Sequence, residues 1–326
     1  MTLCWTIFIV GIFMLYFGAT WLVNGSSSLA RSLGLKSLVI GLTVVAFGTS
    51  APELVVSLVS SIQGKSMIAV GNVVGSNICN IALVLGLAAV MRPIWGHRMV
   101  FRRDIPIMLF VCFFLLLISL NSIIGRAEGA ILFVGIILYT LLYYYLAIAE
   151  SGKPSDTNCS DPGEAAREYE YTDSRFRQIL LIAAGIAGVV AGAEMLIHSA
   201  VKIMNSLGVS EKFVGLTIVA FGTSLPELAT SVVAAFRGEM DISIGNLVGS
   251  NVFNILSVIG VSALVRPIPI PGGFMQSGML IDYLVMIFVG FLPWLMAGKT
   301  LVVSRKNGLV LLSCYAGYLA YLILKS

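Results

Sequence analysis

The sequence predicts an all-α integral membrane protein whose ten transmembrane helices form two inverted five-helix repeats. Of its 326 residues, 58% are hydrophobic and only 11% are charged, whereas soluble domains carry about 25% charged residues. Apolar stretches recur along the chain, each close to the roughly 20 residues that cross a hydrocarbon core as a helix. Two segments in the first half also recur, nearly unchanged, 174 residues later.

The apolar stretches divide the chain into two equal sets of five. They lie at about 2–24, 37–61, 66–90, 104–121, 129–149, 178–204, 212–236, 241–265, 279–297 and 300–323. Residues 150–177, dense in charge, Pro, Gly and Ser, predict a linker between a repeat at 1–149 and a repeat at 178–326. Because five is odd, the second repeat enters the membrane from the opposite side, an arrangement that many secondary transporters share.

The distribution of Lys and Arg predicts the orientation. Loops after the odd-numbered stretches hold 14 of the 20 basic residues. Positive charge marks the cytoplasmic side, so the 150–177 linker is expected in the cytoplasm and both termini outside a cell (inner) membrane. Residues 1–23 lack a basic start and a cleavage site, and are interpreted as a retained first helix rather than a signal peptide.

Composition also excludes several classes of function. The net charge of +4 does not favour nucleic-acid binding. The five cysteines are scattered singly and the two histidines lie outside the repeated segments, so neither a disulfide framework nor a zinc or haem site is expected. No G-x-G-D or H-E-x-x-H motif is present, which argues against an intramembrane protease and against an enzyme in general.

The repeated segments each carry one glutamate. Residues 41–54 (GLTVVAFGTSAPEL) and 215–228 (GLTIVAFGTSLPEL) agree at 12 of 14 positions, and 68–81 and 242–255 agree at 9 of 14. Together they define two motifs, at 41–81 and 215–255. Glu53 and Glu227 lie within apolar stretches, where a charge costs roughly 2.5–3.5 kcal/mol even on lenient scales. Their repetition in the same setting therefore predicts a functional pair.

Residues around each glutamate predict a cluster of oxygen atoms. Pro52 lacks an amide hydrogen, so we expect a kink and carbonyl groups without partners from Ala46 to Gly48. Thr49 and Ser50 lie about one turn before Glu53, on the same helical face. The second repeat has the same arrangement at Thr223, Ser224, Pro226 and Glu227.

The second pair of segments, G-N-x-x-G-S-N-x-x-N, adds hydroxyl and amide groups. Ser76 and Asn80 lie one turn apart, as do Ser250 and Asn254. Carboxylate, hydroxyl, amide and carbonyl oxygens suit Ca²⁺ better than zinc or copper. Two glutamates neutralise one Ca²⁺, two Na⁺ or two protons, so one site can serve competing cations in turn. The remaining asparagines of these segments are interpreted as amides that pack helices together: Asn72, Asn77, Asn246 and Asn251.

At these residues, along the whole chain, the sequence resembles the cation/calcium exchanger superfamily, most closely its prokaryotic sodium/calcium exchanger branch. The resemblance implies an antiporter that exchanges Na⁺ for Ca²⁺ by alternating access, at a midplane site between spans 2, 3, 7 and 8. It implies no cofactor, a monomer sufficient for transport, and a paired unit of spans 1 and 6 that slides against the others. The residues it implies as ion ligands are Glu53, Glu227, Ser50, Ser224, Ser76, Ser250, Asn80 and Asn254, with Thr49, Thr223, Ala46 and Ala220 contributing mainly backbone carbonyls.

The sequence leaves open which ion is exchanged for Ca²⁺ and whether the protein is an exchanger or a channel. Some sodium/calcium exchangers carry aspartate at the position of Asn254, so a third ionisable group is missing here. The alternative is an antiporter of the same fold that exchanges Ca²⁺ or another divalent cation for H⁺. That branch typically has a glutamate after each G-N pair, where this chain has 73–75 (VVG) and 247–249 (LVG). A channel is the remaining alternative.

Overall fold

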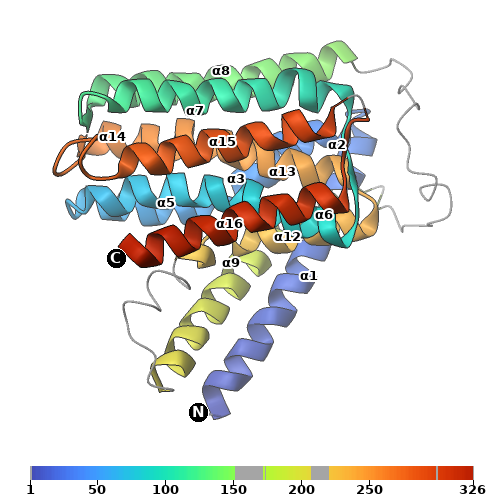
Figure 1. Ribbon diagram of the computed structural model, residues 1–326. Coiled ribbons are helices and arrows are strands. Elements are labelled where there is room, and N and C mark those ends of the chain that lie inside the picture. Colours follow the sequence, from blue (N-terminus) through green and yellow to red (C-terminus); the bar gives the residue numbers. More distant parts are fainter. Residues whose placement is uncertain (1, 151–171, 173, 207–219, 299, 326) are drawn as a thin grey trace.

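The described residues are almost entirely helical. The computed structural model describes residues 2–150, 172, 174–206, 220–298 and 300–325, and most of its helices lie side by side along one direction (Figure 1). Up to residue 150 the helical segments are α1 (Thr2–Ser32), α2 (Ser37–Ile40), η1 (Gly41–Val45), α3 (Ala46–Thr49), α4 (Ala51–Ile62), α5 (Ser66–Ile78), η2 (Cys79–Leu85), α6 (Gly86–Met91), η3 (Val100–Asp104), α7 (Ile105–Ser119) and α8 (Arg126–Glu150). Beyond the linker they are α9 (Arg175–Ser206), α11 (Ala220–Gly222), α12 (Leu225–Arg237), α13 (Met240–Phe253), η7 (Asn254–Ile259), α14 (Gly260–Val265), α15 (Met279–Ala297) and α16 (Arg305–Lys325).

Most of these helices suit a membrane. Within the described residues, seven continuous helices are long and apolar enough to span one, and the bent pair Ser37–Thr49 and Ala51–Ile62 raises the number to eight if it is one span. The predicted stretch at 104–121 contains the 15-residue helix α7, which continues without a break from η3. The stretch at 212–236 is described only from Ala220 onward.

Several of the long helices contain a π-helical segment, labelled η, which has one more residue in its turn than an α-helix. In α5–η2–α6 the segment begins at Cys79, and in α13–η7–α14 it begins at Asn254, one position later in the repeat than Cys79. Such segments commonly occur at functional sites because they rotate the following side chains relative to the preceding ones. Here they follow directly on the two S-N motifs.

Two short sheets join loops that the sequence assigns to the same side. β1 (Ile94–Trp95) pairs antiparallel with β4 (Val302–Val303). β2 (Ile123–Ile124) pairs antiparallel with β3 (Ile268–Pro269). β1 follows the third predicted span, and β2 and β3 follow the fourth and eighth. β4 follows the ninth but lies within the stretch at 300–323 predicted as the tenth, where the helix α16 begins only at Arg305. The pairing thus agrees with the alternation of the predicted spans.

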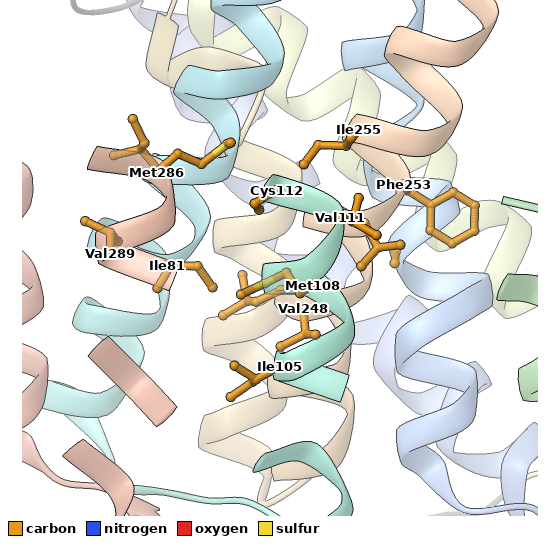
Figure 2. Close-up of a cluster of buried hydrophobic side chains, with 14 of the residues drawn as sticks. Ile81, Ile105, Met108, Val111, Cys112, Val248, Phe253, Ile255, Met286 and Val289 are labelled. Atoms are coloured by element: carbon orange, nitrogen blue, oxygen red, sulfur yellow. The ribbon is translucent and has the colours of Figure 1, made fainter. Parts of the chain in front are cut away.

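The apolar interior forms two clusters. The larger one joins α5, η2, α7, α13, η7 and α15, with side chains such as Ile81, Met108, Val248 and Met286 facing one another (Figure 2). The smaller one lies where α1 and α9 pack against η1 and α12. Both clusters border the segments that carry the repeated motifs, so the motif residues lie inside the protein.

Helices α1 and α9 run side by side, at an angle to the rest (Figure 1). Glycines on both helices bring the two backbones together. A Cβ added at Gly18 would lie 2.6 Å from the backbone nitrogen of Val189, and one at Gly185 would lie 2.5 Å from that of Leu22. Small residues allow such close approach between membrane helices, where packing rather than hydrophobicity drives association.

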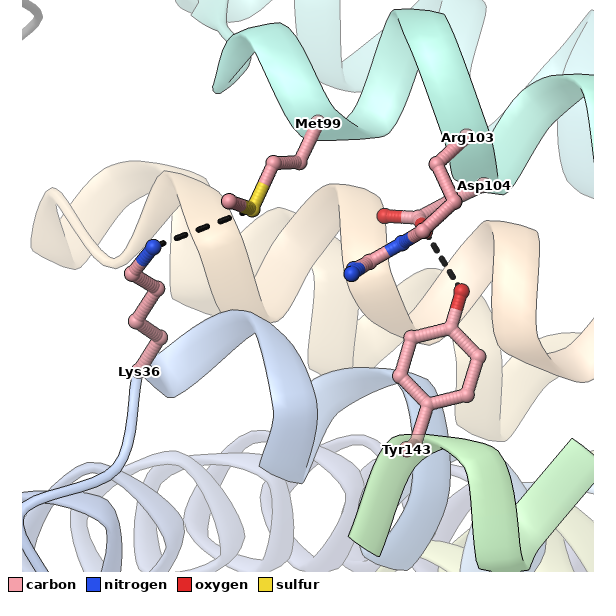
Figure 3. A network of polar contacts seen from close by, with 5 residues as sticks. All are labelled: Lys36, Met99, Arg103, Asp104 and Tyr143. Carbon is pink, nitrogen blue, oxygen red and sulfur yellow. Dashed lines mark hydrogen bonds and ion pairs between the residues drawn. The ribbon is translucent and has the colours of Figure 1, made fainter. Parts of the chain in front are cut away.

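A buried aspartate ties α7 to α8. Asp104 Oδ1 accepts hydrogen bonds from Arg103 Nε at 2.6 Å and from Tyr143 OH at 2.5 Å, and the Arg103 guanidinium stacks 4.9 Å from the centre of the Tyr143 ring (Figure 3). A comparable bond joins α15 to α16, where Tyr318 OH donates to Asp282 Oδ1 at 3.1 Å. In both halves a tyrosine thus fixes an aspartate near the start of the preceding helix.

We expect Tyr143→Phe to destabilise the protein by about 1–3 kcal/mol, because it removes a hydrogen bond to a buried charged group. Thermal unfolding of the purified protein in detergent measures the effect. Tyr144→Phe is the matched control, since the Tyr144 side chain is 66% exposed on the adjacent position of the same helix. Equal melting temperatures for the two variants would contradict the role given to Tyr143.

Candidate functional site

Both glutamates lie at the start of a helix that follows a break. The first break is at Ser50 (φ −84°, ψ 7°) and the second at Ser224 (φ −88°, ψ 5°), after which α4 and α12 begin with proline in the first turn. The predicted kink is therefore present, but two residues before each proline, because proline is favoured in the first turn of a helix. Glu53 and Glu227 occupy these first turns, where the helix dipole stabilises negative charge.

The expectation that the carbonyl groups from Ala46 to Gly48 lack partners is wrong for Ala46. The Ala46 carbonyl keeps its helical partner, accepting from the Ser50 amide at 3.0 Å, and the Thr49 hydroxyl lies 3.4 Å from the same oxygen. Pro52 removes only the hydrogen bond to the residue four positions earlier, Gly48. The carbonyl of Ala46 can bind a cation only through its second lone pair.

The two carboxylates are fully buried and close enough to interact electrostatically. Glu227 Oε1 accepts a hydrogen bond from Ser50 Oγ at 3.1 Å, so a hydroxyl of the first motif contacts the carboxylate of the second. Ser76 lies beside Glu53, and Ser250 lies beside Glu227. The structure thus brings both glutamates together with three of the four predicted serines, Ser50, Ser76 and Ser250.

Threonines next to the breaks bind asparagines of the opposite motif. Thr49 Oγ1 donates to Asn246 Oδ1 at 3.0 Å and lies 3.4 Å from Ser250 Oγ. In the mirrored arrangement, Thr223 Oγ1 donates to Asn72 Oδ1 at 3.3 Å and lies 3.4 Å from Ser76 Oγ. Each threonine hydroxyl is therefore hydrogen-bonded to an asparagine of the opposite motif.

Sequence reasoning missed two serines that hold these asparagines in place. Asn72 Nδ2 donates to Ser57 Oγ at 3.0 Å, and Asn246 Nδ2 donates to Ser231 Oγ at 2.9 Å. The signal was available, because each serine follows its glutamate by four residues and the two are 174 positions apart. Asn72 Nδ2 also donates to the backbone carbonyl oxygen of Glu53 at 3.3 Å, which fits the packing role expected of Asn72.

Several of the predicted ligands carry buried oxygen atoms that have no hydrogen-bond partner within the described residues. Buried polar atoms are nearly always paired, yet six oxygens of predicted ligands have no partner within the described residues: Glu53 Oε1 and Oε2, Glu227 Oε2, Ser224 Oγ, Asn80 Oδ1 and Asn254 Oδ1. All six can donate electron density to a hard cation such as Ca²⁺. In the described part of the chain, no group of three or more His, Cys, Asp or Glu side chains could hold a metal, so the predicted site combines two carboxylates with neutral oxygens.

Comparison with known proteins shows which family the sequence is similar to. The sequence profile of the family described as "Sodium/calcium exchanger protein" matches residues 3–149 and 177–324. The chain is 35% identical over 294 residues to the inner membrane protein YrbG of Escherichia coli, covering 90% of this chain and 88% of YrbG. It is 30% identical over 349 residues to the sodium/calcium exchanger MaX1 of Methanosarcina acetivorans, covering 98% and 99%.

Solved structures agree too. The fold is similar to that of the sodium-calcium exchanger NCX_Mj, determined after soaking in 2.5 mM Na⁺ and 0.1 mM Ca²⁺, with a TM-score of 0.81, 31% sequence identity and 98% of both chains covered. Both the sequence and the fold thus match exchangers over nearly their full length. The chain therefore belongs to the sodium/calcium exchanger family, as a multi-pass membrane antiporter and not an enzyme.

Proposed function

We propose that this protein exchanges Na⁺ for Ca²⁺ across the membrane by alternating access, at a midplane site that contains Glu53 and Glu227. One observation carries the proposal: two fully buried carboxylates lie at helix starts, and three of their four oxygens have no hydrogen-bond partner within the described residues. Their combined charge of −2 balances one Ca²⁺ or two Na⁺. Binding one ion therefore excludes the other, which is the physical requirement for coupled exchange.

The proposed ligands satisfy the demands of calcium. Ca²⁺ takes about 6–8 oxygens at roughly 2.3–2.6 Å, more than two carboxylates supply. The ligands we propose are Glu53, Glu227, Ser50, Ser224, Ser76, Ser250, Asn80 and Asn254 by their side chains, and Thr49, Thr223, Ala46 and Ala220 by backbone carbonyls. No cofactor enters the scheme, and the ions are substrates.

We also propose the topology: ten transmembrane helices as inverted repeats at 1–149 and 178–326. The mirrored hydrogen bonds of the two motifs support twofold symmetry, and the excess of Lys and Arg supports a cytoplasmic linker with both termini outside. Because both glutamates and all the proposed ligands come from one chain, one copy is enough to build the site. A monomer is then sufficient for transport.

The alternative ion to be exchanged for Ca²⁺ is the proton. Two buried carboxylates can carry two protons as readily as two Na⁺, and the amide at Asn254 leaves no third ionisable group among the proposed ligands. An exchanger of Ca²⁺ or another divalent cation for H⁺ would use the same site. The chemistry of the ligands is shared, so the driving ion decides between the two functions.

Uptake of radiolabelled Ca²⁺ into proteoliposomes tests the proposal. Vesicles loaded with Na⁺ and diluted into Na⁺-free buffer should accumulate Ca²⁺, whereas vesicles loaded with K⁺ or choline should not. Accumulation driven only by an outward H⁺ gradient would establish the alternative. Absence of uptake under every gradient, from correctly folded protein, would contradict both functions.

A further inference from the structure

Four asparagines form a closed set of hydrogen bonds where α5–η2 crosses α13–η7. Asn77 Nδ2 donates to the backbone carbonyl of Asn251 at 3.1 Å, and Asn251 Nδ2 donates to that of Asn77 at 3.3 Å. Asn254 Nδ2 donates to Asn77 Oδ1 at 3.1 Å, and Asn80 Nδ2 donates to Asn251 Oδ1 at 3.1 Å. Each bond connects one motif to the other, and each has its mirror image.

This arrangement determines which way the amides face. A backbone carbonyl can only accept hydrogen bonds, so the bond from Asn77 Nδ2 to the Asn251 carbonyl orients the Asn77 amide. A methionine sulfur on the same side, Met286 Sδ at 3.8 Å from Asn77 Nδ2, is a weak acceptor that favours the same orientation. Asn77 Oδ1 must then receive a donor, and the only group that Asn254 can present to it is Nδ2.

The consequence lies at the other end of the Asn254 side chain. With Nδ2 bound to Asn77, the side-chain oxygen of Asn254 remains, and this buried Oδ1 has no hydrogen-bond partner among the residues that the structure describes. The same holds for Asn80 Oδ1, whose Nδ2 is bound to Asn251. A reversed amide would turn two N–H donors toward a cation and repel it. The orientation therefore decides whether these side chains attract or repel an ion.

We propose that Asn77 and Asn251 are positioning residues that present the carbonyl oxygens of Asn254 and Asn80 to the transported cation. The inference rests on the proposed function, because it requires a cation at this site. It replaces the packing role expected from the sequence with a specific one. It also couples the two motifs, since the amide ligand of each is oriented by an asparagine of the other.

Calcium binding to purified protein tests the proposal, measured by isothermal titration calorimetry in Na⁺-free buffer. Asn77→Ala should weaken Ca²⁺ binding about 10-fold or more, as loss of groups that orient metal ligands typically does. The double variant Asn77→Ala/Asn254→Ala should bind no more weakly than Asn254→Ala alone, because Asn77 acts through Asn254. The same pattern is expected for Asn251 and Asn80.

Met286→Leu is the matched control. It removes the weak sulfur contact to the same amide with little change in volume, and it should leave the Ca²⁺ affinity within about twofold of wild type. Asn77→Ser and the independent Asn251/Asn80 pair serve if Asn77→Ala does not fold. Melting temperatures without Ca²⁺ identify the folded variants.

Two results would overturn the positioning role. One is a folded Asn77→Ala protein with wild-type Ca²⁺ affinity, which would leave Asn77 a packing residue. The other is an equal further loss on adding Asn77→Ala to Asn254→Ala, which would mean that Asn77 acts without Asn254. Failure of wild-type protein to bind Ca²⁺ at all would instead overturn the proposed function, and the positioning role with it.

Discussion

Replacing Glu53 or Glu227 by glutamine should abolish Ca²⁺ exchange and weaken Ca²⁺ binding by at least about a thousandfold. A unit charge about 4 Å from a cation is worth roughly 4 kcal/mol at an effective dielectric constant of about 20, and each 1.4 kcal/mol is about tenfold in affinity. Glutamine keeps the size of the side chain and one carbonyl oxygen. The change therefore isolates the charge.

In the absence of ions, the same glutamine substitutions should not destabilise the protein, although they weaken Ca²⁺ binding. Burying two carboxylates away from water without a bound cation is unfavourable, so either variant should keep or raise the melting temperature in buffer without Na⁺ and Ca²⁺. Wild-type protein should be stabilised by added Ca²⁺, because a ligand that binds only the folded state raises its stability, whereas the variants should not respond.

Glu128→Gln is the control for this pair. Glu128 lies at the start of α8, where its Oε2 accepts from the Gly125 amide at 3.0 Å, far in the sequence from either motif. Its replacement should leave both Ca²⁺ binding and exchange unchanged. Retained Ca²⁺-dependent stabilisation in Glu53→Gln would show that the ion binds elsewhere and would remove the basis of the proposed mechanism.

The sequence predicts helix ends best where the buried part of a helix is also its apolar part. The apolar stretches at 66–90 and 241–265 correspond to continuous helices that end at Met91 and Val265. Composition predicts that the first stretch ends at about residue 24, but α1 continues to Ser32. Its polar end is stabilised by packing, because Ser26, Ser27 and Ser28 are buried. Composition alone does not reveal such tertiary contacts.

The site was predictable in its residues but not in its connections. Repetition at a constant offset identified Glu53, Glu227 and the neighbouring serines, and helical spacing showed which of them share a face. Which faces meet across the two halves depends on how distant helices pack. The bond from Ser50 to Glu227 and the one from Thr49 to Asn246 therefore appear only in the structure.

Replacing Gly18 by alanine should separate α1 from α9 and destabilise the protein by about 1–3 kcal/mol, the usual cost of overpacking. The added Cβ would meet backbone atoms, Val189 N at 2.6 Å and Gly188 C at 2.7 Å, which cannot rotate away as a side chain can. Gly185→Ala introduces the same conflict from the other helix and should have a similar effect. Thermal unfolding in detergent measures both.

Transport should suffer more than ion binding in these variants. α9 packs against both motifs, since a Cβ at Gly48 would lie 2.4 Å from Ile186 Cδ1 and one at Gly222 would lie 2.4 Å from Ile197 Cδ1. If α1 and α9 move as one body during exchange, loosening their contact slows the movement while the ligands of the site stay in place. We therefore expect a reduced exchange rate with little change in equilibrium Ca²⁺ affinity.

Gly317→Ala on α16 is the matched control, because an added Cβ there meets no described atom within 4 Å and alanine is favoured over glycine in a helix. It should leave melting temperature and exchange unchanged or slightly raise stability. If Gly18→Ala keeps the wild-type melting temperature and exchange rate, α1 and α9 can move apart at no cost in free energy. That result would contradict the description of these two helices as a rigid, tightly packed pair.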